Sequence, residues 1–294
     1  MGGARPGRLE PPPPGGLGGD PARQAPGKGP EARPKPCGPV RRGPRPSLAQ
    51  AQQAQGKPGV PGGLQAGRPR GGRHRRYGKI LPKEVLEVPP YGFLNLHPSL
   101  LPKYRGPAPV QWALIRGEKE TGVSIVKTEE GLDTGPLYAL WRTEILPEED
   151  AVALSERLRD KGIELLLEVL ERLPHLVPVP QEGEASYAPL LTKEEGRMRF
   201  GESAEAIYNR HRGVQPWPGS YFFHGGKRVK VLRMRPEPGQ GTPGVVQAVD
   251  REGVLVGTGE GLIRLLEVQP EGKRPMPAAD WARGYGVGPG TRLE

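Results

Sequence analysis

The 294-residue sequence has few of the residues that staple small secreted proteins or carry a chain across a membrane. Its one cysteine, Cys37, excludes an internal disulfide framework and is typical of a reducing compartment. No apolar run approaches the roughly 20 residues that a membrane-spanning helix needs. The basic N-terminus has no apolar core segment and is therefore not a secretory signal. We expect a cytoplasmic protein without a membrane partner.

A second absence divides the chain near residue 77. Ile, Phe, Trp and Tyr do not occur before Tyr77, and residues 1–76 consist mainly of Pro, Gly, Arg and Ala. Such a low-complexity segment cannot bury enough apolar surface to offset the entropy that is lost on ordering, so we predict that it is disordered. It is then either a basic arm for RNA phosphates or a passive tail.

The net charge and the spacing of the histidines indicate which kinds of partner and ligand the chain is expected to bind. The 43 Lys and Arg residues outnumber the 33 Asp and Glu residues, and the net charge of +10 indicates an anionic partner. No histidine pairs with a cysteine or a carboxylate at a spacing typical of metal ligands, so we expect no metal. The histidines considered for this are His74, His175, His211 and His224.

Periodic apolar patterns begin at residue 77 and predict strands and helices in alternation. The expected elements are a helical turn at 83–88, strands at 91–97, 121–127 and 137–143, and helices at 109–116 and 150–173. The last helix has an apolar stripe that includes Val152, Leu158, Ile163, Leu167 and Leu170, and we expect this stripe to be core. Prolines in the following segment predict an extended linker at 174–199.

The C-terminal part predicts a small β-barrel. A helix at 203–212 is followed by Pro216-Trp217-Pro218, which is expected to bury one aromatic side chain and to fix the entry into a strand. Short segments separated by turns then suit a barrel. The expected strands are 221–224, 228–233, 244–250, 254–257 and 262–268.

The candidate catalytic residues lie at the end of one strand and in one loop. Asn95 and His97 alternate with leucines and therefore point to the same side of the strand at 91–97. An amide can donate to an oxyanion, and an imidazole can give or take a proton near neutral pH. Taken alone, an Asn-x-His pair is more often a cap at a sheet edge. Asp133 lies in the glycine-bounded loop 131–135, where aspartate commonly forms an Asx-turn.

Two motifs change this assessment. Asn-Leu-His-Pro-Ser-Leu-Leu-Pro-Lys-Tyr-Arg-Gly-Pro-Ala-Pro at 95–109 and Gly-Leu-Asp-Thr-Gly at 131–135 together closely resemble the formyltransferases that use 10-formyltetrahydrofolate. With the barrel, the resemblance is to the branch that formylates initiator methionyl-tRNA, and it covers residues 77–294. It implies an α/β fold, with a Rossmann-like formyltransferase domain at 77–173 and an OB-like β-barrel that binds tRNA at 200–294.

The resemblance also implies roles for individual residues. Asn95 and His97 would stabilise or protonate the reacting formyl group, while Asp133 would either orient His97 or help to remove the amine proton. The residues implied in folate binding are Ser99, Leu100, Leu101 and Pro102. Those implied in binding tRNA phosphates are Lys103, Arg105, Lys227, Arg228 and Lys230. The reaction requires 10-formyltetrahydrofolate as co-substrate and no metal, and we expect a monomer.

Other acceptors and another class of protein stay open. A ribonucleotide formyltransferase would share the Asn, His and Asp residues but lacks a barrel after Pro-Trp-Pro. A sugar formyltransferase can carry such a barrel, but it would usually be fused to further domains. A non-enzymatic RNA-binding protein, made of a basic arm and a barrel, would bind tRNA but not folate.

Residues 1–76 do not match the family's pattern. At this place the family has the opening strands and helices of its sheet, which are missing or replaced here. Codons built from G and C alone encode Gly, Ala, Pro and Arg, the residues that dominate this segment. We hypothesise that residues 1–76 are an out-of-frame translation that rejoins the true frame near Tyr77. Reading the upstream DNA in the other frames tests this hypothesis.

Overall fold

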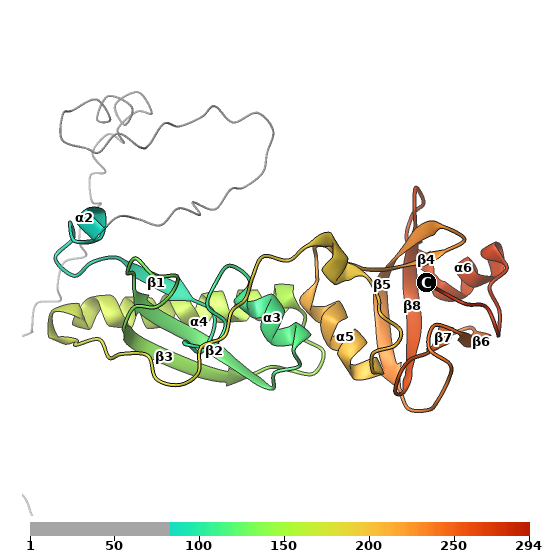
Figure 1. Cartoon of the computed structure of the whole chain (residues 1–294), viewed down its shortest axis with the longest axis horizontal. Coiled ribbons are helices and arrows are strands. Elements are labelled where there is room, and N and C mark those ends of the chain that lie inside the picture. The colour runs from blue at the N-terminus through green and yellow to red at the C-terminus, as the bar shows by residue number, and fades with distance from the viewer. Residues whose placement is uncertain (1–82) are drawn as a thin grey trace, which may run out of the picture. The chain divides into compact units, whose positions relative to one another are not determined.

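The computed structural model describes residues 83–294 (Figure 1). The predictions for residues 1–76, and for the segment at 77–82, lie outside this range. The first described part holds a helical turn, α2 (Lys83–Leu86), and three strands, β1 (Leu94–His97), β2 (Glu120–Lys127) and β3 (Leu137–Glu144). Its two longer helices are α3 (Pro109–Ile115) and α4 (Ala151–Arg172). All these elements were predicted, with boundaries within a few residues.

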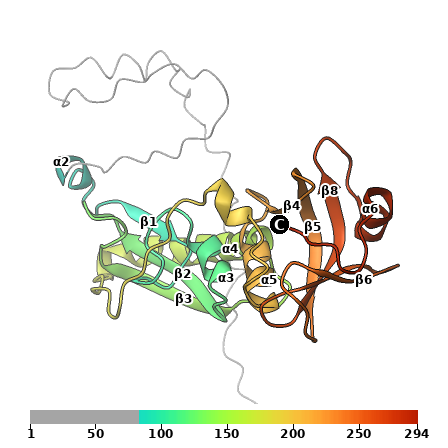
Figure 2. The ribbon, with the colours of Figure 1, turned by 45° about the vertical axis from the view of Figure 1, so that its right-hand side comes forward.

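The strands form an antiparallel sheet in the order β1-β2-β3, and α4 lies alongside it (Figures 1 and 2). The register pairs Asn95 with Val126 and His97 with Ser124, which fixes where the candidate catalytic side chains stand. The core beneath the sheet is made of fully buried side chains from β2 and α4, including Val123, Ile125 and Leu158. Among the described strands, the site is thus carried by an outer strand, β1, whose neighbour β2 is buried.

The predicted apolar stripe of α4 is only partly core. Leu154, Leu158 and Gly162 are buried against the sheet, whereas Val152, Ile163, Leu167 and Leu170 are between 41% and 56% exposed. The prediction was wrong for these four because one residue turns a helix by about 100°. Positions 163, 167 and 170 therefore form a second line beside the buried one, and this line stays about half exposed.

The second part is an antiparallel sheet with one helix before it and one after. The helix α5 (Ala204–Gly213) precedes a sheet ordered β4-β5-β8-β7-β6, with β9 paired to β8. The strands are β4 (Ser220–His224), β5 (Lys227–Glu237), β6 (Val246–Asp250), β7 (Gly253–Gly257), β8 (Leu262–Pro270) and β9 (Met276–Pro277). The helix α6 (Ala278–Tyr285) was not predicted, because the sequence-based prediction placed no element after the strand at 262–268 and eight residues make only about two helical turns.

The buried aromatic of this part is also not the predicted one. Trp217, between the two prolines, is 54% exposed, which corrects the expectation that Pro-Trp-Pro buries its aromatic. The core is instead filled by Trp281 of α6, whose ring lies edge-on to Phe222 at 5.5 Å between centroids. The amphipathic helix α6 therefore packs against the sheet, with Trp281 on its buried face.

The last residues close the sheet into a barrel. The strands β4 and β6 stand at its two ends. Phe223 of β4 exchanges two backbone hydrogen bonds with Glu294, while Val246 of β6 donates to Thr291. Leu293 also donates to Gly244, just before β6. The segment 291–294 thus supplies the pairing that two open edges lack, as expected for a barrel.

Candidate active site

The candidate site is a cavity of about 480 Å³ at the end of β1. Asn95, His97 and Asp133 all line it, together with Gly106 from the loop that follows β1. His97 is the last residue of β1, because Pro98 cannot continue the strand. Asp133 comes from the loop between β2 and β3. The structure therefore brings together the three residues that were predicted to be catalytic, and their catalytic roles stay predictions.

Asp133 is held by neutral donors. Its Oδ1 accepts from the Asn95 amide at 3.2 Å, and its Oδ2 accepts from the Gly106 backbone N–H at 2.9 Å. The backbone of Asp133 has a φ of +52°, the left-handed region in which aspartate is one of the few tolerated residues. The loop thus places a carboxylate, 13% exposed, in a tight turn beside His97.

The hydrogen bonds of His97 define its tautomer. Its Nε2 lies 2.8 Å from the backbone oxygen of Tyr104, and a carbonyl oxygen can only accept. The proton of neutral His97 is therefore on Nε2, which leaves the lone pair on Nδ1. That Nδ1 lies 3.7 Å from Asp133 Oδ2. Protonation of Nδ1 would place a new positive charge directly against the carboxylate.

The Tyr104 carbonyl, which is the partner of His97, is held in place by other hydrogen bonds of Tyr104. The Tyr104 hydroxyl donates to Glu118 Oε1 at 2.6 Å, and its backbone N–H donates to Ser186 Oγ. Burial, followed by the hydrogen bond to Glu118, raises the pKa of the Tyr104 phenol well above its usual value. Tyr104 is therefore a neutral anchor whose carbonyl orients the imidazole.

The residues predicted to bind folate lie beside the site but outside its cavity. The Ser99 side chain is fully buried, and its hydroxyl donates to the Lys103 backbone oxygen at 2.7 Å. Leu100, Leu101 and Pro102 line a different cavity, of about 330 Å³. The loop that they form is fixed by Ser124, whose hydroxyl donates to Ser99 O and accepts from Leu101 N. Their assignment to folate stays a prediction.

The residues predicted to bind tRNA fall into two groups. Lys103 is exposed, whereas Arg105 is half-buried and donates two hydrogen bonds to Gln181 Oε1. On β5, Lys227 and Arg228 are exposed and Lys230 is half-buried. Arg228 lies over the ring of Tyr221, and Arg197, which the sequence did not single out, lies in the same way over Phe223. The outer side of β4 and β5 thus combines cations with aromatic rings.

Sequence reasoning missed two contributors to the site, Gly106 and Gln181. Gly106 acts through its backbone N–H, which every residue except proline has, so no residue type signals it. Gln181 lies 48 residues from Asp133, in a segment predicted to be a linker. No group of three or more potential metal ligands occurs within residues 83–294, and the helices there are too short or too polar to cross a membrane.

Comparison with known proteins gives first the class. Residues 75–170 match the "Formyl transferase" family model, and residues 190–286 match "Formyl transferase, C-terminal domain". The crystal structure of HypX from Aquifex aeolicus in complex with tetrahydrofolic acid shares the fold, with a TM-score of 0.51 and 24% identity. That alignment covers 64% of this chain and 34% of HypX. The predicted fold class, a Rossmann-like formyltransferase domain followed by an antiparallel C-terminal domain, is confirmed.

Closer relatives give the family. The methionyl-tRNA formyltransferase of Thermus thermophilus is 77% identical over 217 residues, which cover 74% of this chain and 71% of that protein. The enzyme of the same name from Deinococcus radiodurans is 48% identical over 219 residues, or 74% of this chain and 69% of that protein. This chain belongs to the methionyl-tRNA formyltransferase family.

Proposed function

We propose that this chain transfers the formyl group of 10-formyltetrahydrofolate to the α-amino group of initiator methionyl-tRNA. Membership in the family supports the reaction, and the arrangement of Asn95, His97 and Asp133 around one cavity supports its chemistry. The observation that carries the proposal is that His97 Nδ1, the ring nitrogen that does not face the Tyr104 carbonyl, lies 3.7 Å from Asp133 Oδ2. The proposal includes the predicted cytoplasmic location and monomeric state.

The reaction needs an oxyanion donor and a proton carrier. When the neutral amine attacks the formyl carbon, the carbonyl π-electrons move to oxygen and the amine nitrogen becomes positive. One N–H of the Asn95 amide donates to Asp133, and the other is available to the oxyanion. His97 Nδ1 takes the amine proton and returns it to N10 as the carbon–nitrogen bond to the folate breaks.

Asp133 would compensate the charge on His97 during this transfer. Both carboxylate oxygens already accept hydrogen bonds, from Asn95 and Gly106, and Oδ2 faces Nδ1 of His97. An imidazolium formed at Nδ1 would therefore meet a negative charge that no other cation has taken up among the described residues. This supports charge compensation over direct removal of the amine proton by the carboxylate.

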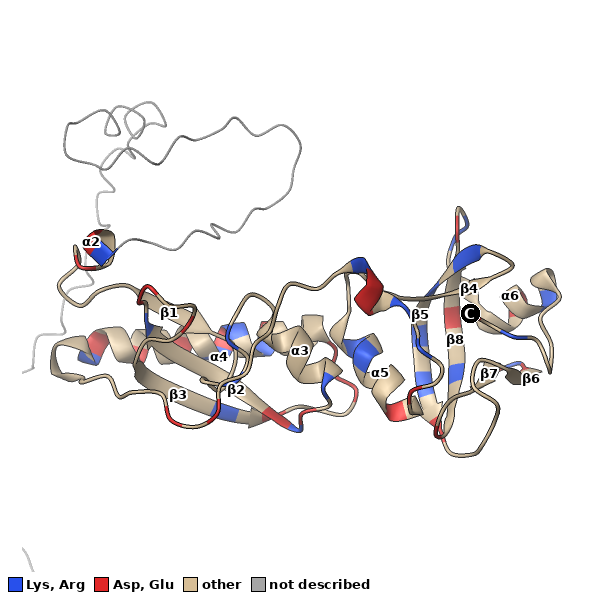
Figure 3. Ribbon diagram, viewed as in Figure 1, with Lys and Arg blue, Asp and Glu red and all other residues tan. Residues whose placement is uncertain are grey.

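The barrel would meet the phosphates of the tRNA. Lys and Arg residues recur along β5 (Figure 3). Within residues 83–294, Lys227, Arg228 and Lys230 make no ion pair with a carboxylate, so their charge is available to an anionic partner. Rings under the guanidinium groups of Arg228 and Arg197 would hold these groups in place.

Formyl transfer from labelled 10-formyltetrahydrofolate to methionyl-tRNA tests the proposal. The wild-type chain should incorporate label, and His97→Ala and Asn95→Ala should each lower kcat by about a hundredfold or more. Uncharged tRNA and a nucleotide-linked amino sugar serve as control acceptors. Near wild-type transfer by His97→Ala would contradict the mechanism. Retention of tRNA without any formyl transfer would instead favour the RNA-binding alternative.

A further inference from the structure

The segment 177–189, which we call the strap, is not a passive linker. Val179 exchanges two backbone hydrogen bonds with Leu137 at the start of β3. Further along, Ser186 O accepts from Arg105 N at 2.8 Å, and Ala188 N donates to Arg105 O at 2.7 Å. The strap therefore pairs with both segments that supply partners to the site, the loop after β1 and the loop that leads into β3.

Gln181 lies at the centre of the strap and bonds to both loops at once. Its Nε2 donates to Asp133 O at 2.7 Å and to Gly135 O at 2.8 Å. Its Oε1 accepts from Arg105 Nη2 at 2.7 Å and Nε at 3.2 Å. The amide thus uses both of its donors and both lone pairs of its oxygen, and it is fully satisfied.

These bonds determine where the carboxylate of Asp133 stands. The Asp133 backbone is in the left-handed region, and its carbonyl oxygen is fixed by Gln181. Arg105, the other partner of Gln181, directly precedes Gly106, whose N–H donates to Asp133 Oδ2. One side-chain amide therefore connects the Asp133 backbone to the segment that holds the Asp133 carboxylate.

We infer that Gln181 is a positioning residue that keeps the Asp133 carboxylate beside His97 Nδ1. The inference rests on the proposed function for the meaning of that position. Only a neutral amide fits, because a glutamate would present two acceptors to the two carbonyl oxygens of the Asp133 loop. In this assignment Arg105 supports the site through Gln181, rather than meeting tRNA phosphates.

Steady-state kinetics of two variants test the inference. Gln181→Ala and Gln181→Glu should both lower kcat by about 30- to 100-fold, because small displacements of a catalytic group cost that much. The KM values for 10-formyltetrahydrofolate and methionyl-tRNA should stay within about two-fold, since Gln181 does not line the cavity at the end of β1. Gln240→Ala, the same change at an exposed glutamine of the barrel, is the matched control and should leave kcat unchanged. A kcat within about three-fold of wild type for Gln181→Ala overturns the inference.

A double-mutant cycle separates positioning from a general structural role. If Gln181 acts through Asp133, Gln181→Ala should lower kcat by less than about three-fold in an Asp133→Asn background. The same 30- to 100-fold loss in both backgrounds would mean that Gln181 acts independently of Asp133, and would overturn the inference.

Hydrogen exchange gives a measure that does not depend on activity. Gln181→Ala should speed amide exchange at residues 128–137, while protection of β2 and of the barrel should match that of Gln240→Ala. Unchanged exchange at 128–137 overturns the inference. Loss of formyl transfer in the wild-type chain would overturn the proposed function alone, because the exchange measurement still decides whether Gln181 holds the loop.

Discussion

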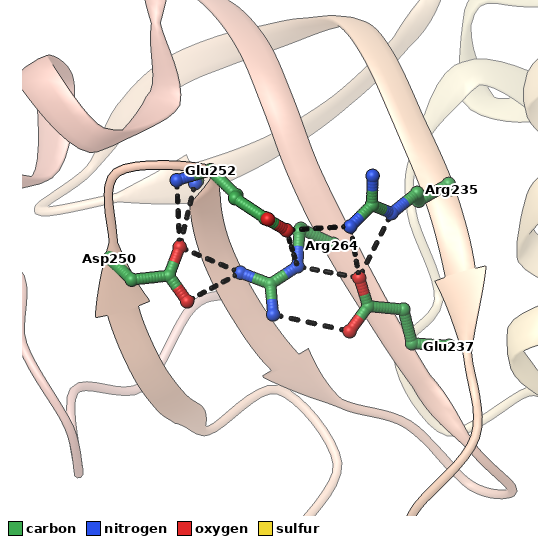
Figure 4. Close-up of polar contacts among 6 residues, drawn as sticks. Arg235, Glu237, Asp250, Glu252 and Arg264 are labelled. Atoms are coloured by element: carbon green, nitrogen blue, oxygen red, sulfur yellow. Dashed lines mark hydrogen bonds and ion pairs between the residues drawn. The ribbon is translucent and has the colours of Figure 1, made fainter.

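Two charged groups of this chain, Asp133 near the end of β1 and Arg264 in the barrel, are held in opposite ways. Asp133 accepts hydrogen bonds from an amide and a backbone N–H, and both donors are neutral. Arg264 is 7% exposed and donates to two carboxylates, Glu237 and Asp250, with closest distances of 2.6 Å and 2.9 Å (Figure 4). A third carboxylate, Glu252, lies 4.0 Å from Arg264 and 2.8 Å from Arg235.

The difference is that the charge of Asp133 is not balanced by a Lys or Arg side chain within the described part of the chain, whereas the charge of Arg264 is balanced by carboxylates. Hydrogen bonds from Arg264 lower the pKa values of Glu237 and Asp250, and the bond to Glu237 raises the pKa of Arg264. Arg264, Glu237 and Asp250 therefore stay charged over a wide pH range, and the charge of Arg264 is taken up by its two carboxylate partners. Asp133 has no such cation among the described residues, so its charge can act on His97.

Asp133→Asn tests most directly whether the charge of Asp133 acts in the reaction. The asparagine keeps the size of the side chain and one acceptor oxygen but removes the charge. We expect kcat to fall by about 100- to 1,000-fold, with a change in unfolding free energy below about 1 kcal/mol. Formyl transfer and urea unfolding measure the two quantities. Asp280→Asn, an exposed aspartate of α6, is the control. Transfer within about five-fold of wild type would show that the charge of Asp133 is not used.

The convergence of Asn95, His97 and Asp133 could be predicted because the motifs at 95–109 and 131–135 together resemble one family, and the local geometry agrees with it. An amide and an imidazole two apart on a strand point the same way, and an aspartate between glycines marks a turn. The register of β1 against β2 does not follow from alternation in the same way, because β2 is buried on both faces, with Ser124 and Val126 as buried as Val123 and Ile125.

The supports of the site could not be predicted, because they depend on contacts that leave no pattern in the sequence. Gly106 contributes a backbone N–H, and Gln181 reaches the Asp133 loop from a proline-rich segment. The Arg264 cluster could not be predicted from the sequence for a similar reason. Its acidic partners Glu237 and Asp250 lie 27 and 14 residues away, and only the pairing of β5 with β8, β8 with β7 and β7 with β6 brings them together.

Low pH should destabilise the fold through a buried base, His211, that has no charged hydrogen-bond partner. His211 of α5 is 7% exposed, and its Nδ1 lies 3.0 Å from the Ser220 hydroxyl. Burial lowers the pKa of His211 from 6.5 to about 4. The unfolded chain therefore binds this proton first as the pH falls, and stability is lost between pH 6.5 and about 4.

We expect His211 to make the unfolding free energy fall by about 3 kcal/mol between about pH 7.5 and pH 4. In His211→Gln this part of the pH dependence should disappear, because glutamine does not titrate. His175→Gln, at an exposed histidine, should retain it. Urea unfolding at several pH values measures the difference. Parallel pH profiles for the wild type and His211→Gln would contradict the assignment.

Arg264→Met tests whether the paired cluster is structural. Methionine keeps much of the volume, but it leaves Glu237, Asp250 and Glu252 close together with only Arg235 between them. We expect a loss of about 2 kcal/mol, below the range for fully buried pairs because Asp250 and Glu252 are half exposed. Arg235→Met, at the exposed edge of the cluster, should cost clearly less stability than Arg264→Met. Activity per folded molecule should not change, and a selective loss of kcat would show that the cluster serves the reaction.

The smallest effects of substitution are expected on the outer side of β5, where the cations have no carboxylate partner among the described residues and do not line the candidate active site. Arg228→Ser and Lys230→Ser should each weaken binding of methionyl-tRNA about three- to five-fold at moderate salt. Each should also lower the slope of log affinity against log salt concentration by about one unit. At saturating tRNA, kcat should match the wild type. Arg283→Ser removes a cation that is paired with Asp280 at 3.2 Å, so it should leave both the affinity and the slope unchanged. If Arg283→Ser weakens binding as much as Arg228→Ser, the tRNA responds to net charge alone, and pairing does not decide which cations of the barrel it meets.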